Sequence, residues 1–145
     1  MKFRFNILIM IFLVAVFSLT SCEPDKDEND NNTSYNDTRD KFVGSWNCVE
    51  NSSQFGQNTY NVTISLNPNN SSEILIANIY HLGFDEKAYA IVNNISVTIP
   101  FQYVCNNTNT IKGNGLLSGN NKINWTYYVD DGADIDTCIA VYTRL

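Results

Sequence analysis

The stretch "KINWTYYV" (residues 122–129) decides the fold, because apolar and polar side chains alternate along its whole length. One face carries Ile123, Trp125, Tyr127 and Val129, and Tyr128 falls on the opposite, polar face. Successive side chains of a strand point to opposite faces, so a period of two is typical of a strand with one buried face. The stretch predicts a β-strand whose buried face is rich in aromatic rings.

The same alternation extends along the chain in both directions. "TYNVTISL" (59–66) repeats it, and "TIKGNGLL" (110–117) places Gly113 and Gly115 on one face, where glycine marks a bend or the close approach of another backbone. Turns rich in Asn, Gly and Pro separate the segments. We predict eight strands, at residues 42–50, 58–66, 73–80, 87–92, 95–104, 109–118, 121–130 and 135–144.

The connections between these strands are short, which favours antiparallel neighbours and an all-β, eight-stranded antiparallel meander. A meander can close into an up-and-down β-barrel, which removes its exposed edges. Pro100 interrupts the fifth strand and predicts a corner or bulge there. A barrel of eight strands has room for a filled core or for one small ligand, and large aromatic side chains such as Trp125 favour filling.

The N-terminus has the pattern of an export signal. Lys2 and Arg4 precede an apolar stretch at residues 7–17 that is shorter than the ~20 residues of a membrane-spanning helix. Directly before Cys22, a short motif resembles the lipobox of bacterial lipoproteins: Leu19, Thr20 and Ser21. The resemblance implies cleavage before Cys22, which would then carry a diacylglycerol thioether and an amide-linked acyl chain such as palmitate. Several acyl chains make a stable membrane anchor. The alternative is an ordinary cleaved signal with a chance cysteine.

Residues 22–40 are acidic and polar, with almost nothing apolar to bury, which predicts a flexible linker. Within it, Lys26, Asp27 and Glu28 resemble the surface-export signal of Bacteroidetes lipoproteins; the alternative is a solvated spacer. The resemblance implies an outer-membrane lipoprotein at the cell surface, with a periplasm-facing position as the alternative. We divide the chain into a lipoprotein signal peptide (1–21), an anchored linker (22–40) and a barrel domain (41–145).

The chain is acidic. Once Lys2 and Arg4 leave with the signal, 15 acidic residues face 7 basic ones, a net charge of −8. Binding to nucleic acid relies on a basic surface, so no nucleic-acid partner is expected.

The segment "DKFVGSW" (40–46) contains Gly44-x-Trp46, after a short stretch suited to one helical turn capped by Asn36 or Asp37. This resembles the Gly-x-Trp opening of lipocalins and other calycin barrels. In those barrels the Trp closes one end and is covered by an Arg of the last strand, a place that Arg144 would take here. More broadly, residues 42–145 are similar to small lipocalin-like lipoproteins of Bacteroidetes, particularly through "YNVTIS" and "AVYTRL". The resemblance implies a lipocalin-like barrel.

Catalytic and metal-binding motifs are hard to place. His81 is the sole histidine, so a catalytic triad or dyad would have to be built on it, and a loop role is the alternative. The sequence has no metal-ligand spacing and implies no cofactor. "DDGADID" (130–136) predicts a solvated hairpin turn, with a weak calcium site as the alternative. No pairing is indicated for the remaining candidate acids, which are Glu50, Glu73, Asp85 and Glu86.

Three cysteines fall in the barrel domain: Cys48, Cys105 and Cys138. If the first strand lies beside the last, Cys48 and Cys138 could be neighbours and form a disulfide, which an exported protein permits. The alternative is that all three are small buried core residues.

Together these features predict a lipid-anchored, non-catalytic envelope protein. Its expected partners are the membrane, through the N-terminal lipid, and a small apolar ligand, a glycan or another protein. The alternatives are a structural or interaction lipoprotein with a filled core, and a small envelope hydrolase that uses His81.

Overall fold

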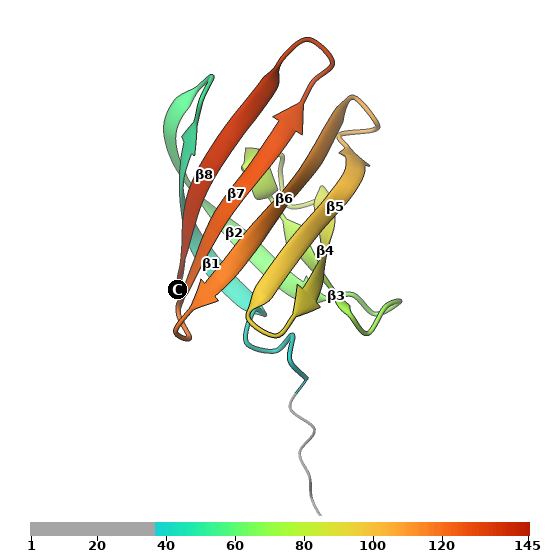
Figure 1. The fold of residues 1–145 in the computed structure, drawn as a ribbon, viewed down its shortest axis with the longest axis vertical. Helices are drawn as coiled ribbons and strands as arrows, with labels where there is room; N and C mark the ends of the chain where they lie inside the picture. The colour runs from blue at the N-terminus through green and yellow to red at the C-terminus, as the bar shows by residue number, and fades with distance from the viewer. Residues whose placement is uncertain (1–36) are drawn as a thin grey trace, which may run out of the picture. The chain divides into compact units, whose positions relative to one another are not determined.

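The structure is a computed structural model that describes residues 37–145. Its strands are β1 (Gly44–Ser52), β2 (Gly56–Leu66), β3 (Glu73–Ala77), β4 (Lys87–Asn93), β5 (Ser96–Val104), β6 (Asn109–Ser118), β7 (Lys122–Asp130) and β8 (Ile135–Arg144). A short 3₁₀ helix, η1 (Ile79–His81), lies between β3 and β4. The strands follow one another in chain order around a closed barrel (Figure 1). The predicted all-β, eight-stranded antiparallel meander is therefore confirmed.

The barrel closes where β1 pairs with β8 in an antiparallel register that sets Trp46 opposite Arg144 and Ser52 opposite Cys138. The predicted irregularity at Pro100 is present, because the β5–β6 register shifts between Ile99 and Gln102. Within residues 37–145, no helix has the length and apolar composition needed to cross a membrane.

Four predicted strand bounds are wrong by two or more residues: the end of the third strand, both ends of the first, which spans Gly44–Ser52 rather than 42–50, and the start of the second, at Gly56 rather than residue 58. The third strand ends at Ala77 rather than at residue 80, because Asn78 adopts a left-handed backbone (φ 64°) and turns the chain into η1. Tyr80 (φ 54°) and His81 (φ 59°) continue this left-handed stretch. The first strand begins at Gly44 rather than at residue 42, since Phe42 belongs to the turn before it.

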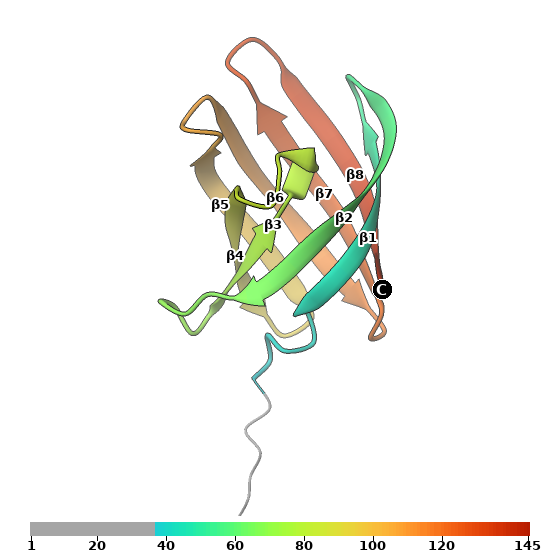
Figure 2. The ribbon, with the colours of Figure 1, turned by 180° about the vertical axis from the view of Figure 1, so that it is seen from behind.

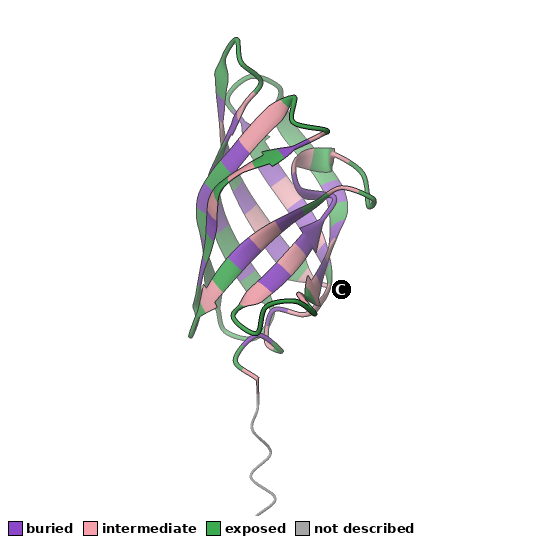
Figure 3. Cartoon of the chain, turned by 90° about the vertical axis from the view of Figure 1, so that its right-hand side faces the viewer, coloured by how far each residue is buried: buried purple, intermediate pink, exposed green. Residues whose placement is uncertain are grey.

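Buried and exposed residues alternate along the strands, as Figure 3 shows. In β7 the alternation is complete from Lys122 to Val129. Full burial of a large apolar side chain contributes roughly 1.5–3 kcal/mol, so the inward residues dominate the stability of the barrel. The largest fully buried side chains are aromatic: Trp46, Trp125, Tyr127, Tyr142 and Phe42. The barrel interior is thus largely filled by its own side chains.

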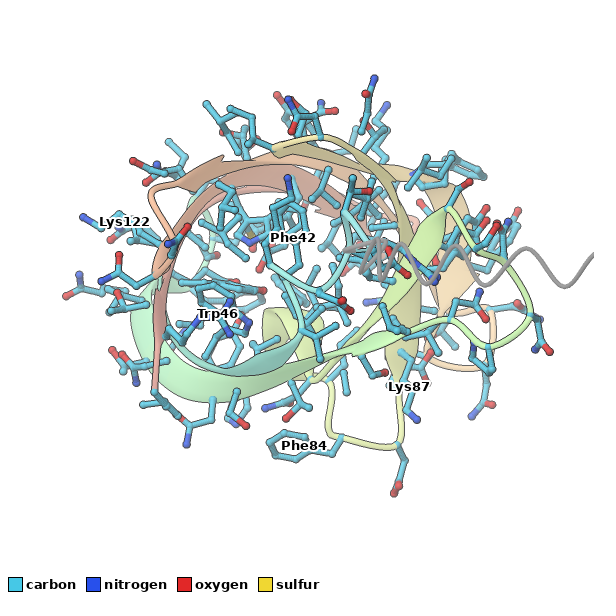
Figure 4. The ribbon with its side chains drawn as sticks, turned by 90° about the horizontal axis from the view of Figure 1, so that it is seen from below. Phe42, Trp46, Phe84, Lys87 and Lys122 are labelled. Carbon is cyan, nitrogen blue, oxygen red and sulfur yellow. The ribbon has the colours of Figure 1, made fainter. Side chains whose placement is uncertain are left out.

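One end of the barrel is closed by residues 37–43. Asp37 caps a single turn by accepting a hydrogen bond from Arg39 N (2.9 Å), which is the predicted capped turn with Asp37 as its cap. Phe42 is fully buried, and its carbonyl accepts the Trp46 indole N–H at 2.9 Å. Viewed from this end in Figure 4, Phe42 and Trp46 lie inside the ring of strands, whereas Lys122 lies outside it.

Arg39 and Lys41 tie this segment to the neighbouring hairpin turns. Arg39 donates to the carbonyls of Asn70 (2.8 Å) and Glu73 (2.9 Å) at the β2–β3 turn. Lys41 Nζ donates to Asn94 Oδ1 (3.2 Å) at the β4–β5 turn. We call this end the sealed end. Arg39 is only 7% exposed, so the folded part of the chain includes this residue, which lies within the range 22–40 predicted as a linker.

Arg144 completes the sealed end from β8. Its guanidinium carbon lies 4.2 Å from the centre of the Trp46 ring, a cation–π geometry. Arg144 also donates to the carbonyls of Val43 (2.7 Å), of Lys41, and of Asn120 (3.0 Å) at the β6–β7 turn. Gly44 allows this approach, since a Cβ there would lie 2.8 Å from Arg144 Nη1.

Candidate functional site

The opposite end of the barrel, which we call the mouth, is formed by the β1–β2, β3–β4, β5–β6 and β7–β8 turns. The β3–β4 connection carries η1, which folds across the mouth (Figure 2). Ile79 is fully buried and belongs to the core. The Asn78 side chain fixes the segment, because its amide donates to Asn61 O (2.7 Å) and its oxygen accepts from Gly83 N (2.7 Å). The segment from Asn78 to Gly83 therefore acts as a plug.

Asp136 is the central side chain of the mouth and is 2% exposed. Its Oδ2 accepts the hydroxyls of Ser52 (2.5 Å) and Tyr80 (2.9 Å), and its Oδ1 accepts Ser53 Oγ (2.8 Å) and Gln54 N (3.2 Å). Burial alone would raise the pKa of Asp136, but these four hydrogen bonds together lower it below its ordinary value. Asp136 is thus an ionised carboxylate that holds the β1–β2 turn and the plug to β8.

A second buried carboxyl, Glu50, lies deeper in the barrel and is also 2% exposed. Its Oε2 accepts the hydroxyls of Tyr60 (2.5 Å) and Tyr127. Burial raises the pKa of Glu50; the Tyr60 hydrogen bond opposes this shift and the charge of Asp136 adds to it. The pKa values of these two neighbouring carboxyls are therefore shifted in opposite directions. Asp136 is ionised, whereas Glu50 favours its neutral form.

Two further polar atoms in the interior have no hydrogen-bond partner among the described residues. They are the Trp125 indole Nε1 and the Tyr142 hydroxyl, and both belong to inward-facing, buried residues whose rings lie 5.6 Å apart. An unpaired buried polar group costs about 1–3 kcal/mol, so the pair marks the interior as capable of one or two more hydrogen bonds.

A hollow of about 130 Å³ opens beside Asp136 at the mouth. Phe55 and Tyr80 supply aromatic walls, with their ring centres 6.5 Å apart, and Phe55 is 68% exposed. Asp131 and Asp134 of the β7–β8 turn also line the hollow. Hydrogen bonds from the turn backbone lower the pKa of Asp131, which favours its ionised form.

The "DDGADID" segment divides between two environments. Asp130 and Asp131 accept hydrogen bonds from the N–H groups of their own turn, those of Gly132 (2.8 Å) and Ala133 (2.9 Å), as a solvated hairpin turn requires. Asp136 instead points into the mouth. No group of three His, Cys, Asp or Glu side chains within residues 37–145 is arranged to hold a metal ion.

His81 lies at the mouth, exposed, with its ring stacked on Tyr60 at 5.1 Å between ring centres. Among residues 37–145, no hydrogen bond joins its side chain to a Ser, Thr or Cys that could act as a nucleophile. The remaining acids considered from the sequence do not gather. Glu73 binds the amides of Asn67 and Asn70 near the sealed end, and Glu86 accepts Cys105 N at 2.9 Å.

The structure corrects the possible disulfide between Cys48 and Cys138. Both cysteines are buried free thiols, and Cys105 is also free. Cys48 lies opposite Tyr142, whereas Cys138 lies opposite Ser52, four residues further along β1. At about 3.3 Å per residue that offset is roughly 13 Å, beyond the reach of a disulfide. Burial raises the pKa of Cys48 to about 12, so this thiol is inert.

The residues predicted for delivery lie outside the described part of the chain. They are the cleavage motif Leu19, Thr20 and Ser21, the lipidation site Cys22, and the surface-export motif Lys26, Asp27 and Glu28.

Sequence reasoning missed the roles of Glu50 and Asp136. The signal was present, since Glu50 is two residues from Cys48 and four from Trp46, and therefore shares their inward face on a strand of period two. An acid in such a position is either paired or functional. The buried position of Asp136 was missed because the other acids of its segment are solvated, and the whole segment was predicted to be a solvated turn.

Comparisons with known proteins support the fold. No family model matches the chain, and no curated protein matches it in sequence. Among solved structures it is similar to the protein EF1p2_mFAP2b bound to DFHBI, with a TM-score of 0.54 and 13% identity over 74% of this chain and 97% of that one. It is also similar to a redesigned β-barrel, b11L5F_LGL, with a TM-score of 0.51 and 10% identity over 74% of this chain and 95% of that one. At these identities the likeness shows the barrel fold alone.

Proposed function

We propose that the chain is a lipid-anchored, non-catalytic envelope protein whose barrel binds a small ligand at its mouth. The observation that carries the proposal is the difference between the two ends of the barrel. The sealed end is closed by Phe42, Trp46 and Arg144, while the mouth is hollowed beside Asp136 and lined by aromatic and polar side chains. A ligand of the barrel interior would therefore enter from the mouth.

The chemistry of the hollow favours a ligand with hydrogen-bond donors and an apolar or aromatic part. Phe55 and Tyr80 offer ring surfaces, while Asp131 and Asp134 offer carboxylate oxygens. The lowered pKa values of Asp131 and Asp136 keep negative charge at the mouth, which disfavours anions. At about 130 Å³ the hollow is smaller than the 300–1,000 Å³ typical of drug-sized ligands, so it fits a small molecule or one end of a larger one.

The interior offers a deeper extension of the same site. Below the plug, the unpaired Trp125 indole N–H and Tyr142 hydroxyl lie among apolar core residues. An apolar ligand with one hydrogen-bond acceptor would satisfy the indole N–H, but Ile79 and Tyr80 would have to move to admit it. The left-handed backbone at Asn78, Tyr80 and His81 is strained by about 1–3 kcal/mol per residue. Movement of the plug would release this strain, which would offset part of the free energy that the movement requires.

The absence of a catalytic role is part of the proposal and has two supports. The four acceptor positions that Asp136 uses are occupied by Ser52, Ser53, Gln54 and Tyr80, so it is poorly placed to take a proton from a substrate. His81 stacks on Tyr60 instead of pairing with a nucleophile within the described residues. General base catalysis needs a base within hydrogen-bond reach of the group it deprotonates.

Ligand binding is tested by native mass spectrometry of the full chain purified from its own envelope. We expect a co-purifying small molecule at one per chain, and we expect Phe55→Ala to reduce its occupancy. Phe101→Ala is the matched control, because Phe101 is similarly exposed (60%) but lies on the outer face of β5. A chain that carries no small molecule, or equal occupancy in both variants, would refute ligand binding at the mouth.

Anchoring is tested separately. Cys22→Ala should move the protein from the membrane to the soluble fraction, whereas Cys105→Ala should leave it membrane-bound. Replacement of Lys26, Asp27 and Glu28 by Ala should protect the membrane-bound protein from external protease. If Cys22→Ala stays with the membrane, Cys22 is not the anchor.

The second candidate, a structural or interaction lipoprotein with a filled core, is favoured by the aromatic packing of the interior. Trp46, Trp125, Tyr127 and Tyr142 are all buried and occupy much of the space that a ligand would need. A barrel that co-purifies with proteins but never with a small molecule would support this candidate.

A further inference from the structure

The outer face of β5–β8 carries a groove that differs in chemistry from the mouth. It is an open depression with a volume of about 420 Å³, within the range of ligand sites in proteins. One side is a row of outward residues, one from each strand and paired across the ladder: Thr98, Asn114, Thr126 and Ile139. We call this hollow the outer groove.

The other side of the outer groove is the next outward row, again one residue from each strand: Ser96, Leu116, Asn124 and Val141. Between the rows, the side chains of Val97, Gly115, Trp125 and Ala140 turn inward, so the backbone forms the floor. The groove therefore runs across the strands rather than along them. Three inter-strand spacings of about 4.8 Å give it a length of roughly 14 Å, which suits a linear ligand.

The lining combines neutral polar groups with apolar ones. None of the residues that line the outer groove is ionisable, although the described chain is acidic and the mouth hollow has three aspartates. Hydroxyl and amide side chains, such as those of Thr126 and Asn124, alternate with exposed Leu116 (49%) and Ile139 (58%). Thr98 Oγ1 donates to Asn114 Oδ1 at 3.1 Å, which leaves the Asn114 amide N–H groups available to a ligand.

The backbone of the groove favours a sugar over a peptide. The backbone of every floor residue is already paired with a neighbouring strand of the sheet: Val97 lies opposite Gly115, Gly115 opposite Trp125, and Trp125 opposite Ala140. An extended peptide gains affinity by pairing with an unpaired strand edge, and the groove has none along these strands. Neutral hydroxyl and amide side chains beside aliphatic ones match the hydroxyl groups and C–H faces of a neutral sugar.

We propose that the outer groove binds a neutral, linear oligosaccharide a few rings long. The site is separate from the mouth, since the two share no lining residue. The chain thus has two ligand sites of different chemistry, an acidic and aromatic one at the mouth and an uncharged one on the outer wall.

The test is isothermal titration calorimetry of the full chain, purified from its envelope, with four neutral probes: maltohexaose, cellohexaose, laminarihexaose and mannohexaose. We expect saturable one-to-one binding of at least one probe at millimolar concentration or below. Asn124→Ala removes one neutral hydrogen bond and should weaken binding about fivefold. Thr126→Arg fills the groove with a long side chain and should weaken it more than tenfold.

Thr59→Arg is the matched control, because Thr59 is exposed on β2 and lies outside the groove. It should leave the affinity unchanged, as should Phe55→Ala at the mouth. The proposal is overturned if none of the four probes binds, if Thr126→Arg and Thr59→Arg bind equally, or if a neutral extended hexapeptide binds in place of the sugars. Loss of the mouth ligand in Phe55→Ala with unchanged sugar binding keeps the two sites distinct.

Discussion

Gly113→Ala should destabilise the barrel strongly, because the backbone of β7 leaves no room for a Cβ at this residue of β6. A Cβ at position 113 would lie 2.3 Å from Tyr127 Cβ and 2.6 Å from both Tyr127 Cα and Thr126 O. The shortest of these is 1.1 Å below the 3.4 Å at which ordinary contact begins. The opposing atoms belong to the backbone or are fixed to it, so rotation of a side chain cannot relieve the overlap. Overpacking of this kind costs about 1–3 kcal/mol, and we expect the upper end of that range.

Urea unfolding followed by tryptophan fluorescence measures the effect. A loss of about 3 kcal/mol is a large part of the 5–15 kcal/mol that stabilises a typical domain, and it corresponds to a fall in Tm of roughly 10–20 °C. Asn114→Ala is the control, since Asn114 is the outward neighbour of Gly113 on the same strand. If Gly113→Ala unfolds within about 0.5 kcal/mol of the control, the close approach of β6 and β7 is not a constraint on stability.

Three further predictions concern buried charge and the sealed end. Arg144→Lys loses the planar contact with Trp46 and some of the hydrogen bonds to carbonyl groups, so it should lower the free energy of unfolding in urea by about 1–2 kcal/mol. An unchanged unfolding midpoint would contradict the role of Arg144 in closing the barrel. Glu50 has a folded pKa above its ordinary value of 4.5, so wild-type stability should fall as pH rises from below 4.5 through the folded pKa, by up to ~1.36 kcal/mol per pH unit. Glu50→Gln should lack this decline. Parallel stability profiles for the two proteins would count against the prediction. Asp136 has a folded pKa below its ordinary value of 3.8, so its contribution to folding stability is present above pH 3.8 and is lost as pH falls through the folded pKa. Asp136→Asn should therefore be less stable than the wild type at neutral pH, and the difference in stability should shrink in acid. A difference in stability that stays constant with pH would refute this prediction.

Much of the fold was predictable because β-structure has a short and regular period. The alternation in residues 122–129 identifies both the strand and its buried face, and β7 extends from Lys122 to Asp130 as expected. Gly113 was expected to mark either a bend or the close approach of another backbone, and the β6–β7 contact is of the second kind. The third strand was overextended because residues 78–80 have strand-like composition, whereas Asn78 adopts a left-handed backbone that composition does not reveal.

The candidate sites were less predictable, because they depend on register between distant strands. The distance between Cys48 and Cys138 follows from the β1–β8 register, which no local pattern specifies. The hydrogen bonds of Asp136 come from Ser52 and Tyr80, residues more than 50 positions away in the chain. The rows of the outer groove likewise exist only after four strands have been aligned.

The sequence by itself determined which residues alternate, where the chain turns and hence that eight antiparallel strands form, because side-chain period and turn chemistry are local properties. The tertiary structure alone decided that two acids, one at the mouth and one deeper in the barrel, are buried with opposite pKa shifts, and that neutral side chains line one groove across the outer wall. These features arise when barrel closure fixes the register of all eight strands, and only then does each inward or outward side chain acquire its neighbours.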